Sequence, residues 1–284
     1  LVQVPHCAQG DGGNAAGPRS QPRRQAAGGF AGGRVAGAAA FPISIDSAAL
    51  GEIARRDDVR ARAQQIRRAL GEPEIVLLGV DRLDYIKGIP HRLRAYGELL
   101  NEGRLEPPKA VLVLVAGPSR ERVGYYRLLR DEVEVAVGRI NGEQGELGSP
   151  AVHYLHRSCP REERAALFLA ADVMLVTSLR DGMNLVAKEY VACRHDGSGA
   201  LVLSEFAGAA DELGSAFVVN PHDIEGLKDA IVCAATISPK EARRRMRSMR
   251  RRVRKHDVAH WAAAFLDALR QVPEQGQPPA ASAP

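Results

Sequence analysis

Short apolar runs without polar alternation recur through the middle of the chain and predict β-strands. Continuous apolar character over a few residues is typical of strands that are buried on both faces of a parallel sheet. The pattern predicts such strands at residues 75–80, 110–116, 152–155, 172–177, 200–204 and 216–219.

Amphipathic segments with a helical period lie between these runs. They predict helices at residues 90–101, 120–137, 161–170, 185–193, 207–213 and 223–235. Alternating strands and helices require right-handed crossovers, so the expected fold class is α/β, with a Rossmann-like, doubly wound parallel sheet. Such sheets bind ligands outside the carboxyl ends of their strands. We therefore expect the chemistry in the loops at 81–89, 117–120 and 178–184.

The two ends of the chain lack this alternation. Residues 1–40 contain ten Ala and nine Gly, and too little apolar bulk to offset the backbone entropy of folding. We expect residues 1–40 to be a disordered, low-complexity segment or the damaged remnant of another domain. Residues 41–271 are expected to form one Rossmann-like domain with C-terminal helices, and residues 272–284 a second disordered tail.

Composition and charge exclude several classes of protein. The 284 residues hold 39 Lys and Arg against 34 Asp and Glu, and the net charge of +5 permits anionic ligands without requiring nucleic acid. No run approaches the roughly 18 apolar residues of a transmembrane helix, so no membrane partner is expected. The four cysteines include no C-x-x-C pair, so we expect neither a disulfide framework nor an all-cysteine zinc site. These features, with no readable secretory signal, fit a cytoplasmic protein.

The loop after the first predicted strand carries two cations. Arg82 and Lys87 precede a helix that is expected to begin near Pro90, a favoured first-turn residue. An Arg fork and a Lys point charge beside a helix N-terminus suit a diphosphate. The alternative is that both cations pair with Asp81 and Asp84 at the surface, and charge alone favours that interpretation.

The second loop carries one further cation. Ser119 is an expected N-cap, and Arg120 would then lie in the first turn of the following helix. A cation there opposes the helix dipole, a small cost that an anionic ligand relieves. An ion pair with Glu121 or Asp131 explains Arg120 equally well.

The third loop is the richest in polar groups. Gly182 permits a tight turn, and the amides that follow it open the next helix, where free amides bind hydroxyls or phosphate oxygens. Asp181 can accept a hydroxyl, and Glu189, one turn into the helix, can take both hydroxyls of a ribose. The alternative is an ordinary helix start with Asp181 as its cap and with Lys188 and Glu189 solvated. The density of polar groups around one glycine favours a binding site.

Four segments of the chain together resemble the trehalose-6-phosphate synthases. They are residues 81–89 (DRLDYIKGI), 138–148 (GRINGEQGELG), 179–192 (LRDGMNLVAKEYVA) and 201–213 (LVLSEFAGAADEL). These enzymes are retaining, UDP-glucose-dependent glycosyltransferases with two Rossmann-like domains, the GT-B architecture. The resemblance runs from about residue 41 to about residue 269 and implies the nucleotide-sugar-binding, C-terminal half. It implies glucosyl transfer from UDP-glucose to glucose 6-phosphate, which gives trehalose 6-phosphate.

The resemblance also assigns roles to residues. It implies that Arg82, Lys87 and Asp181 form the catalytic set, in which the two cations neutralise the UDP diphosphate as the sugar–phosphate bond breaks. Arg120 would reach the phosphate of glucose 6-phosphate, and Glu189 the ribose of the donor. The resemblance implies neither a metal nor another cofactor. It also implies that the leaving phosphate takes the acceptor proton, so no carboxylate pair of glycosidase type is required. The implied donor-binding residues are Arg82, Lys87, Gly182, Met183, Asn184, Leu185, Val186 and Glu189.

The chain also departs from the family pattern. Ile86 stands where the family has Thr or Ser, and Ser178 stands where Pro is usual. Nothing in the sequence resembles the N-terminal half, so we expect a truncated chain that is weakly active or inactive alone. A non-catalytic donor-binding fragment and a related GT-B glycosyltransferase with another acceptor phosphate both stay open. The nucleotide preference (UDP, ADP or GDP) and association into a homo-oligomer stay open as well.

Two further patterns invite functional interpretations that we do not favour. Residues 242–255 hold nine basic residues without interleaved aromatics, which predicts the solvated face of a late helix rather than a nucleic-acid partner. His153, His156 and Cys159 fall on a predicted strand and its exit rather than on one helical face, so no metal site is expected there.

Overall fold

The computed structural model describes residues 29–31, 34–36, 39–120 and 122–270. The chain divides into two units, residues 44–257 and a smaller unit formed by the two ends of the chain, 1–43 and 258–284. Residues 1–28 and 271–284, on which the predictions of disordered ends mainly fall, lie outside the described residues. Within the segment 1–40, strands β1 (Gly29–Ala31) and β2 (Arg34–Ala36) pair antiparallel.

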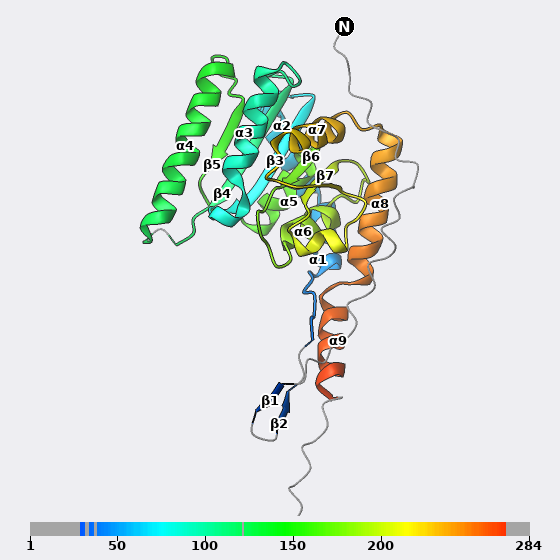
Figure 1. The fold of residues 1–284 in the computed structure, drawn as a ribbon. Helices are drawn as coiled ribbons and strands as arrows, with labels where there is room; N and C mark the ends of the chain where they lie inside the picture. The colour runs from blue at the N-terminus through cyan, green and yellow to red at the C-terminus, as the bar shows by residue number, and fades with distance from the viewer. Residues whose placement is uncertain (1–28, 32–33, 37–38, 121, 271–284) are drawn as a thin grey trace, which may run out of the picture. The chain divides into compact units, whose positions relative to one another are not determined.

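A six-stranded parallel sheet forms the centre of the larger unit (Figure 1). The strand order is β5-β4-β3-β6-β7-β8. From β3 the chain adds strands towards one edge of the sheet, and from β6 it adds them towards the other edge. This is the doubly wound, Rossmann-like sheet that the alternating pattern predicts, and its topological switch point lies at β3 and β6. The strands are β3 (Ile75–Arg82), β4 (Ala110–Gly117), β5 (Val152–Leu155), β6 (Val173–Val176), β7 (Ala200–Ser204) and β8 (Phe217–Val219).

Helices cover both faces of the sheet and build two apolar cores. Alternate residues of one strand enter different cores: Leu78 packs in one and Leu77 in the other. The core around Leu78 takes the helices α1 (Ser47–Arg55), α2 (Asp57–Ala69), α5 (Arg161–Ala170), α6 (Leu185–Cys193) and α8 (Pro239–Lys255). The core around Leu77 takes α3 (Ile89–Asn101), α4 (Gly124–Gln144) and α7 (Ile224–Ala235).

Several helical predictions need correction. Helices α1 and α2 occupy residues 47–69, where no helix was predicted. Helix α4 begins at Gly124, with Val123 as its N-cap, and not at residue 120, because the chain turns at Arg120 with a φ of 44°. Segment 207–213 is not an α-helix and contains the short 3-10 turn η2 (Gly208–Asp211).

The basic run lies on α8, as its pattern predicts. Ala242, Met246, Met249 and Val253 on this helix are buried, whereas seven of the nine cations are exposed. A solvated helix face is therefore confirmed for this segment.

The smaller unit contains α9 (Val258–Arg270), and its apolar side chains contact residues near the other end of the chain. Trp261 Nε1 donates a hydrogen bond to the backbone oxygen of Phe41 at 3.0 Å, and the Phe41 and Phe265 ring centroids lie 5.3 Å apart. Helix α9 thus lies in the part of the chain where C-terminal helices are expected.

Two expectations about the class of protein can be compared with the structure. Of the helices in the described part of the chain, none is both long and apolar enough to cross a membrane. Cys159 and Cys193 are free thiols, whereas Cys233 is disulfide-bonded, so one cysteine of a chain for which no disulfide framework is expected is nevertheless paired.

Candidate functional site

The loops that follow β3 and β6 are held against each other at the switch point of the sheet. The Leu179 amide donates to the Ile86 backbone oxygen at 2.7 Å. Gly88 has a φ of 63°, and a Cβ on it would lie 2.1 Å from the Thr177 backbone oxygen, so both the conformation and the space require glycine. The two loops can approach this closely because residue 88 has no side chain.

This approach brings Lys87 and Asp181 into contact. Lys87 Nζ lies 2.6 Å from Asp181 Oδ2, and both side chains are largely buried, with 13% and 14% of their surfaces exposed. Asn184 Nδ2 and Ser178 Oγ also donate to Asp181 Oδ2, at 3.0 and 3.3 Å. Burial alone would raise the pKa of the Asp181 carboxyl, but the Lys87 ammonium and the Asn184 amide hold that pKa below its usual value. Asp181 is therefore a fixed, ionised acceptor.

Helix α6 begins immediately after this pair. Asn184 is its N-cap, with a φ of 68°, and its side-chain oxygen accepts from the Ala187 amide at 3.0 Å. The cap is therefore Asn184 and not Asp181, against the alternative considered from the sequence. The amides of Leu185 and Val186 precede the first intrahelical bond, and no described residue caps them, so they can bind an anion or a hydroxyl.

The loop after β7 supports the same turn from behind. The Asp181 amide donates to the Phe206 oxygen at 3.0 Å, and the Ala209 amide donates to the Met183 oxygen at 2.8 Å. A Cβ on Gly208 would lie 2.3 Å from the Gly182 oxygen, so this loop also approaches through a glycine. The backbone from Asp181 to Met183 is thus fixed on both sides.

Glu189 lies one turn into α6, apart from the Lys87–Asp181 pair. Only 15% of its side chain is exposed, and its nearest cation is Arg164 of α5, whose Nε lies 3.6 Å from Glu189 Oε2. Within the described residues Oε2 has no hydrogen-bond partner. Burial raises the pKa of the Glu189 carboxyl, and the charges of Arg164 and Arg161 offset only part of that rise. A buried carboxylate oxygen without a donor is a place where a ligand hydroxyl would be stabilising.

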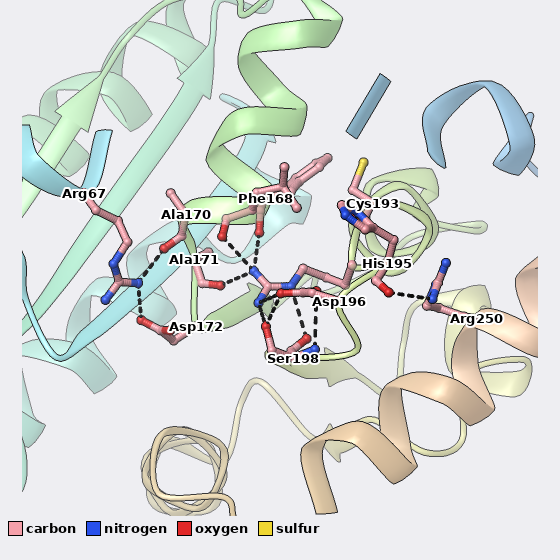
Figure 2. Close-up of polar contacts among 12 residues, drawn as sticks. Arg67, Phe168, Ala170, Ala171, Asp172, Cys193, His195, Asp196, Ser198 and Arg250 are labelled. Carbon is pink, nitrogen blue, oxygen red and sulfur yellow. Dashed lines mark hydrogen bonds and ion pairs between the residues drawn. The ribbon is translucent and has the colours of Figure 1, made fainter. Parts of the chain in front are cut away.

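The far end of α6 is anchored to α5 by Arg194, the residue that follows the helix. One guanidinium nitrogen, Nη1, donates to three backbone oxygens at the end of α5 (Figure 2), those of Phe168, Leu169 and Ala171, at 2.9, 3.0 and 2.7 Å. These carbonyls have no partner within their own helix, and the guanidinium satisfies them. The helix that carries Glu189 is therefore fixed relative to the helix that carries Arg164.

Arg82 remains outside the buried pair. Its side chain is 60% exposed and lies 3.8 Å from Asp84, a weak surface contact. The surface interpretation of this loop therefore holds for Arg82 but not for Lys87, which pairs with Asp181. Asp81 pairs instead with Arg92 of α3, at 2.8 Å and fully buried, a residue that the sequence analysis did not single out.

Arg120 lies before α4 and not in its first turn, so Ser119 is not the N-cap. Its guanidinium donates to Tyr126 Oη at 3.4 Å and lies over the Tyr126 ring at 5.9 Å from the centroid. The Tyr126 ring in turn contacts Tyr85 of the β3 loop, with centroids 6.2 Å apart. Asp131 forms no ion pair with Arg120, and Glu121 lies outside the described residues. Arg120 is thus joined through aromatic rings to the loop that carries Lys87.

One group of three carboxylates in the described part of the chain has the spacing of a metal site. Glu98, Glu102 and Glu225 lie on the side of α3 and α7, away from the loops described above. The Lys228 ammonium already sits among them, at 3.2, 2.5 and 2.6 Å. The group is an internal ion-pair cluster that joins the two helices.

Comparison with known proteins gives consistent matches. The model for glycosyltransferase family 20 matches residues 21–271. The trehalose-6-phosphate synthase of Mycolicibacterium vanbaalenii is 64% identical over 230 residues, which cover 81% of this chain and 47% of the relative. That of Mycobacterium avium is 64% identical over 236 residues, covering 83% and 48%. The chain therefore spans about half the length of these curated relatives.

Solved structures match to the same extent. An α,α-trehalose-phosphate synthase (UDP-forming) from Burkholderia xenovorans, in complex with glucose-6-phosphate, superposes with a TM-score of 0.81 at 38% identity. The match covers 85% of this chain and 53% of that one. An E. coli structure bound with UDP-2-fluoro glucose gives a TM-score of 0.81 at 38% identity, covering 86% and 54%.

Proposed function

The chain belongs to glycosyltransferase family 20, and we propose that residues 44–257 bind UDP-glucose in a synthase that transfers its glucose to glucose 6-phosphate. The observation that carries this proposal is the meeting of Lys87, Asp181 and the first turn of α6 at one edge of the sheet. One place there offers a cation for a diphosphate, a carboxylate for a hydroxyl and open amides for a nucleotide. The 64% identical relatives named above are trehalose-6-phosphate synthases.

In this proposal Lys87 and Arg82 bind the diphosphate. An ammonium has three donors, and the contact with Asp181 uses one of them, so Lys87 can hold Asp181 and phosphate oxygens together. Arg82 is exposed and adds a planar fork from the same loop. Negative charge develops on the diphosphate as the bond to glucose breaks, and fixed cations at that point stabilise it more in the transition state than in the ground state.

Asp181 and Glu189 bind hydroxyls of the donor in two different places. The contacts of Lys87, Asn184 and Ser178 all end on Asp181 Oδ2, so Oδ1 is the atom that a glucose hydroxyl would approach. Glu189 offers its buried Oε2 to the ribose. The amides of Leu185 and Val186 contact the nucleotide between these two carboxylates. Gly182, Met183 and Asn184 shape the backbone around the sugar.

Arg120 is the acceptor contact in this proposal. It lines a shallow cavity with Pro118, Ser119, Arg122 and Val123. Its φ of 44° is unusual for a residue with a long side chain, and strained residues of this kind cluster at ligand sites. Of the described residues, Arg120 is the one that would bind the phosphate of the acceptor and so select a phosphorylated sugar.

Titration calorimetry of the 284-residue chain with nucleotides tests the donor assignment. We expect UDP and UDP-glucose to bind, and Lys87→Ala to weaken both by at least about tenfold, the loss typical of one charge-assisted hydrogen bond. Arg247→Ala, an exposed position on α8, serves as the matched control and is expected to bind both as the parent does. Equal binding by the parent and Lys87→Ala contradicts the donor assignment.

Addition of the separate N-terminal half of a relative tests the transfer step. Release of UDP from UDP-glucose by the combined halves is expected to require glucose 6-phosphate and to fall in Arg120→Ala without a change in UDP affinity. A fall in UDP affinity in that variant instead contradicts the assignment of Arg120 to the acceptor.

A further inference from the structure

A second cavity lies on the larger unit, between α8 and the segment that follows η2. Its volume is about 480 Å³. None of its lining residues belongs to the proposed donor or acceptor site. They are Glu212, Gly214, Ser215, Ser248, Met249, Arg251, Arg252 and Lys255.

The polar residues of α8 in this cavity form one face of the helix. Ser248, Arg251, Arg252 and Lys255 follow the spacing i, i+3, i+4 and i+7, which places neighbouring side chains on the same side. Three positive charges therefore converge on the cavity, and like charges at this spacing repel. This part of the solvated face of α8 therefore also lines a cavity.

No carboxylate of the described residues neutralises these three cations. Arg244 and Arg245, one to two turns earlier on α8, share Glu241 at 2.6 and 2.8 Å. Arg251 and Lys255 form no such pair within the described chain, and Arg252 Nη1 lies 2.7 Å from His256 Nε2. Because a guanidinium can only donate, that ring nitrogen is the acceptor and supplies no negative charge.

The opposite wall of the cavity is held in place by the same helix. Arg245 Nη1 donates to the Ser215 oxygen at 3.2 Å, and its guanidinium lies 4.5 Å from the centroid of the Phe217 ring. Ser215 therefore keeps its position relative to the cations. The cavity is built by fixed elements and not by a loose loop.

Glu212 adds an acceptor to this cationic cavity. Its Oε1 takes the Lys188 ammonium at 2.8 Å, which neutralises the carboxylate, and 10% of the Glu212 side chain is exposed. Its Oε2 is buried and has no hydrogen-bond partner among the described residues. A ligand that carries a hydroxyl beside an anionic group would satisfy both the cations and this oxygen.

We propose that this cavity binds a small phosphomonoester that also carries hydroxyl groups, at a site separate from the donor site. Two Arg forks and a Lys point charge match the oxygens of a phosphate dianion, and Ser215 and Ser248 add hydroxyl donors. The lining holds no aromatic ring on which bases could stack, which favours a small molecule over a single-stranded nucleic acid.

Titration calorimetry with glycerol phosphate and with inorganic phosphate, both in saturating UDP, tests this proposal. We expect glycerol phosphate to bind more tightly than inorganic phosphate, because only the ester offers a hydroxyl to Glu212. Arg251→Gln and Arg252→Gln are each expected to weaken glycerol phosphate by at least about tenfold. The matched control, Arg247→Gln, removes an exposed cation of the same helix outside the cavity and is expected to bind it as the parent does.

Several results overturn the proposal. A phosphate bound at Arg120 does not contact Arg251. Full affinity for glycerol phosphate in Arg251→Gln therefore shows that this ligand binds outside the proposed cavity. An equal loss in Arg247→Gln shows that only the overall charge of α8 matters. Equal affinity for glycerol phosphate and for inorganic phosphate shows that a ligand hydroxyl does not contribute to binding at Glu212. A single-stranded oligonucleotide that displaces glycerol phosphate at a lower concentration than glycerol phosphate itself requires would show that the cavity binds nucleic acid and not a small phosphomonoester.

Discussion

Replacing Glu189 with Gln is expected to stabilise the protein at neutral pH while weakening donor binding. Burial raises the pKa of this carboxyl, so its charged form is disfavoured in the folded state. A raised folded-state pKa means that the contribution of Glu189 to stability is fully present below the pKa of an unfolded glutamate, and is lost as the pH rises through the folded-state pKa. The amide of the Glu189→Gln variant does not titrate and keeps its contribution at every pH.

The magnitude follows from the contacts of this side chain. A buried polar atom without a partner costs about 1–3 kcal/mol, and a charged one costs more. Gln keeps a polar atom at the place of Oε2 but removes its charge, so only the extra cost of the charge is gained, and Arg164 at 3.6 Å already offsets part of that cost. We therefore expect Glu189→Gln to raise the free energy of unfolding by about 1 kcal/mol at pH 7.5 and to leave it nearly unchanged at pH 4. Urea denaturation at the two pH values measures both differences.

Donor binding should change in the opposite direction. If Glu189 accepts from the ribose, the Gln variant loses a charge-assisted bond and binds UDP about ten to a hundred times more weakly. Inorganic diphosphate has no ribose and is expected to bind both proteins equally, which calorimetry with the two ligands measures. A variant that is less stable at pH 7.5, or that binds UDP as the parent does, refutes the argument that this buried charge is kept for a ligand.

Glu241→Gln is the matched control for the stability measurement. Hydrogen bonds from Arg244 outweigh the effect of burial and, with those from Arg245, lower the pKa of the Glu241 carboxyl to about 2. A lowered folded-state pKa gives stability that is present above the unfolded pKa and is lost as the pH falls through the folded one. This variant is therefore expected to lose stability at pH 7.5 and to bind UDP as the parent does.

Four other substitutions probe the loops at the switch point. Lys87→Ala is expected to lower the free energy of unfolding by about 2 kcal/mol in denaturant titrations, because it leaves the buried Asp181 carboxylate without its cation, whereas Arg82→Ala should change it by less than about 1 kcal/mol. Asp181→Asn is expected to lose stability at pH 7, a loss that narrows as the pH falls through the lowered pKa of Asp181. Gly88→Ala should lower the melting temperature and the UDP affinity together, because its Cβ meets the Thr177 oxygen; unchanged affinity would show that the loop contact does not position Lys87.

The sheet could be predicted from the sequence because its strands are buried on both faces. The segments at 152–155 and 200–204 coincide with β5 and β7, and the other predicted strands end within two residues of the observed ones. Helix α2 was missed because its buried face consists of Val59, Ala63 and Ile66 among charged residues. Their spacing is helical, but three small or medium apolar side chains give a weak signal beside many arginines and aspartates.

The start of α4 was misplaced for a different reason. A serine followed by an arginine resembles an N-cap and a first turn, but cap signals assume that the chain then continues with helical φ. Arg120 has a φ of 44°, which ends any helix at that point. A conformation of this kind depends on surrounding contacts, here the Tyr126 ring, and not on the local residue types.

The candidate site was predictable as a set of loops but not as a set of contacts. The rule that ligands bind at the carboxyl ends of parallel strands placed Lys87 and Asp181 at one edge, although 94 positions separate them. Which atoms pair there depends on the distance between the two loops, which Gly88 sets. The Arg164 partner of Glu189 was not predictable, because it depends on how α5 packs against α6.

A buried ion pair beneath the β3 loop explains why Lys87 occupies its position. Arg92 is fully buried and donates to Asp81 Oδ2 at 2.8 Å and to Thr177 Oγ1 at 3.2 Å. Its guanidinium fits because Gly79 has no side chain: a Cβ there would lie 2.0 Å from Arg92 Nη1. The Thr177 hydroxyl in turn donates to the Gly88 oxygen at 3.2 Å. Desolvation largely offsets the attraction within a buried ion pair, so its net contribution to stability is small. Its consequence here is positional, because these bonds join β3, α3 and the end of β6 at the residue that follows Lys87.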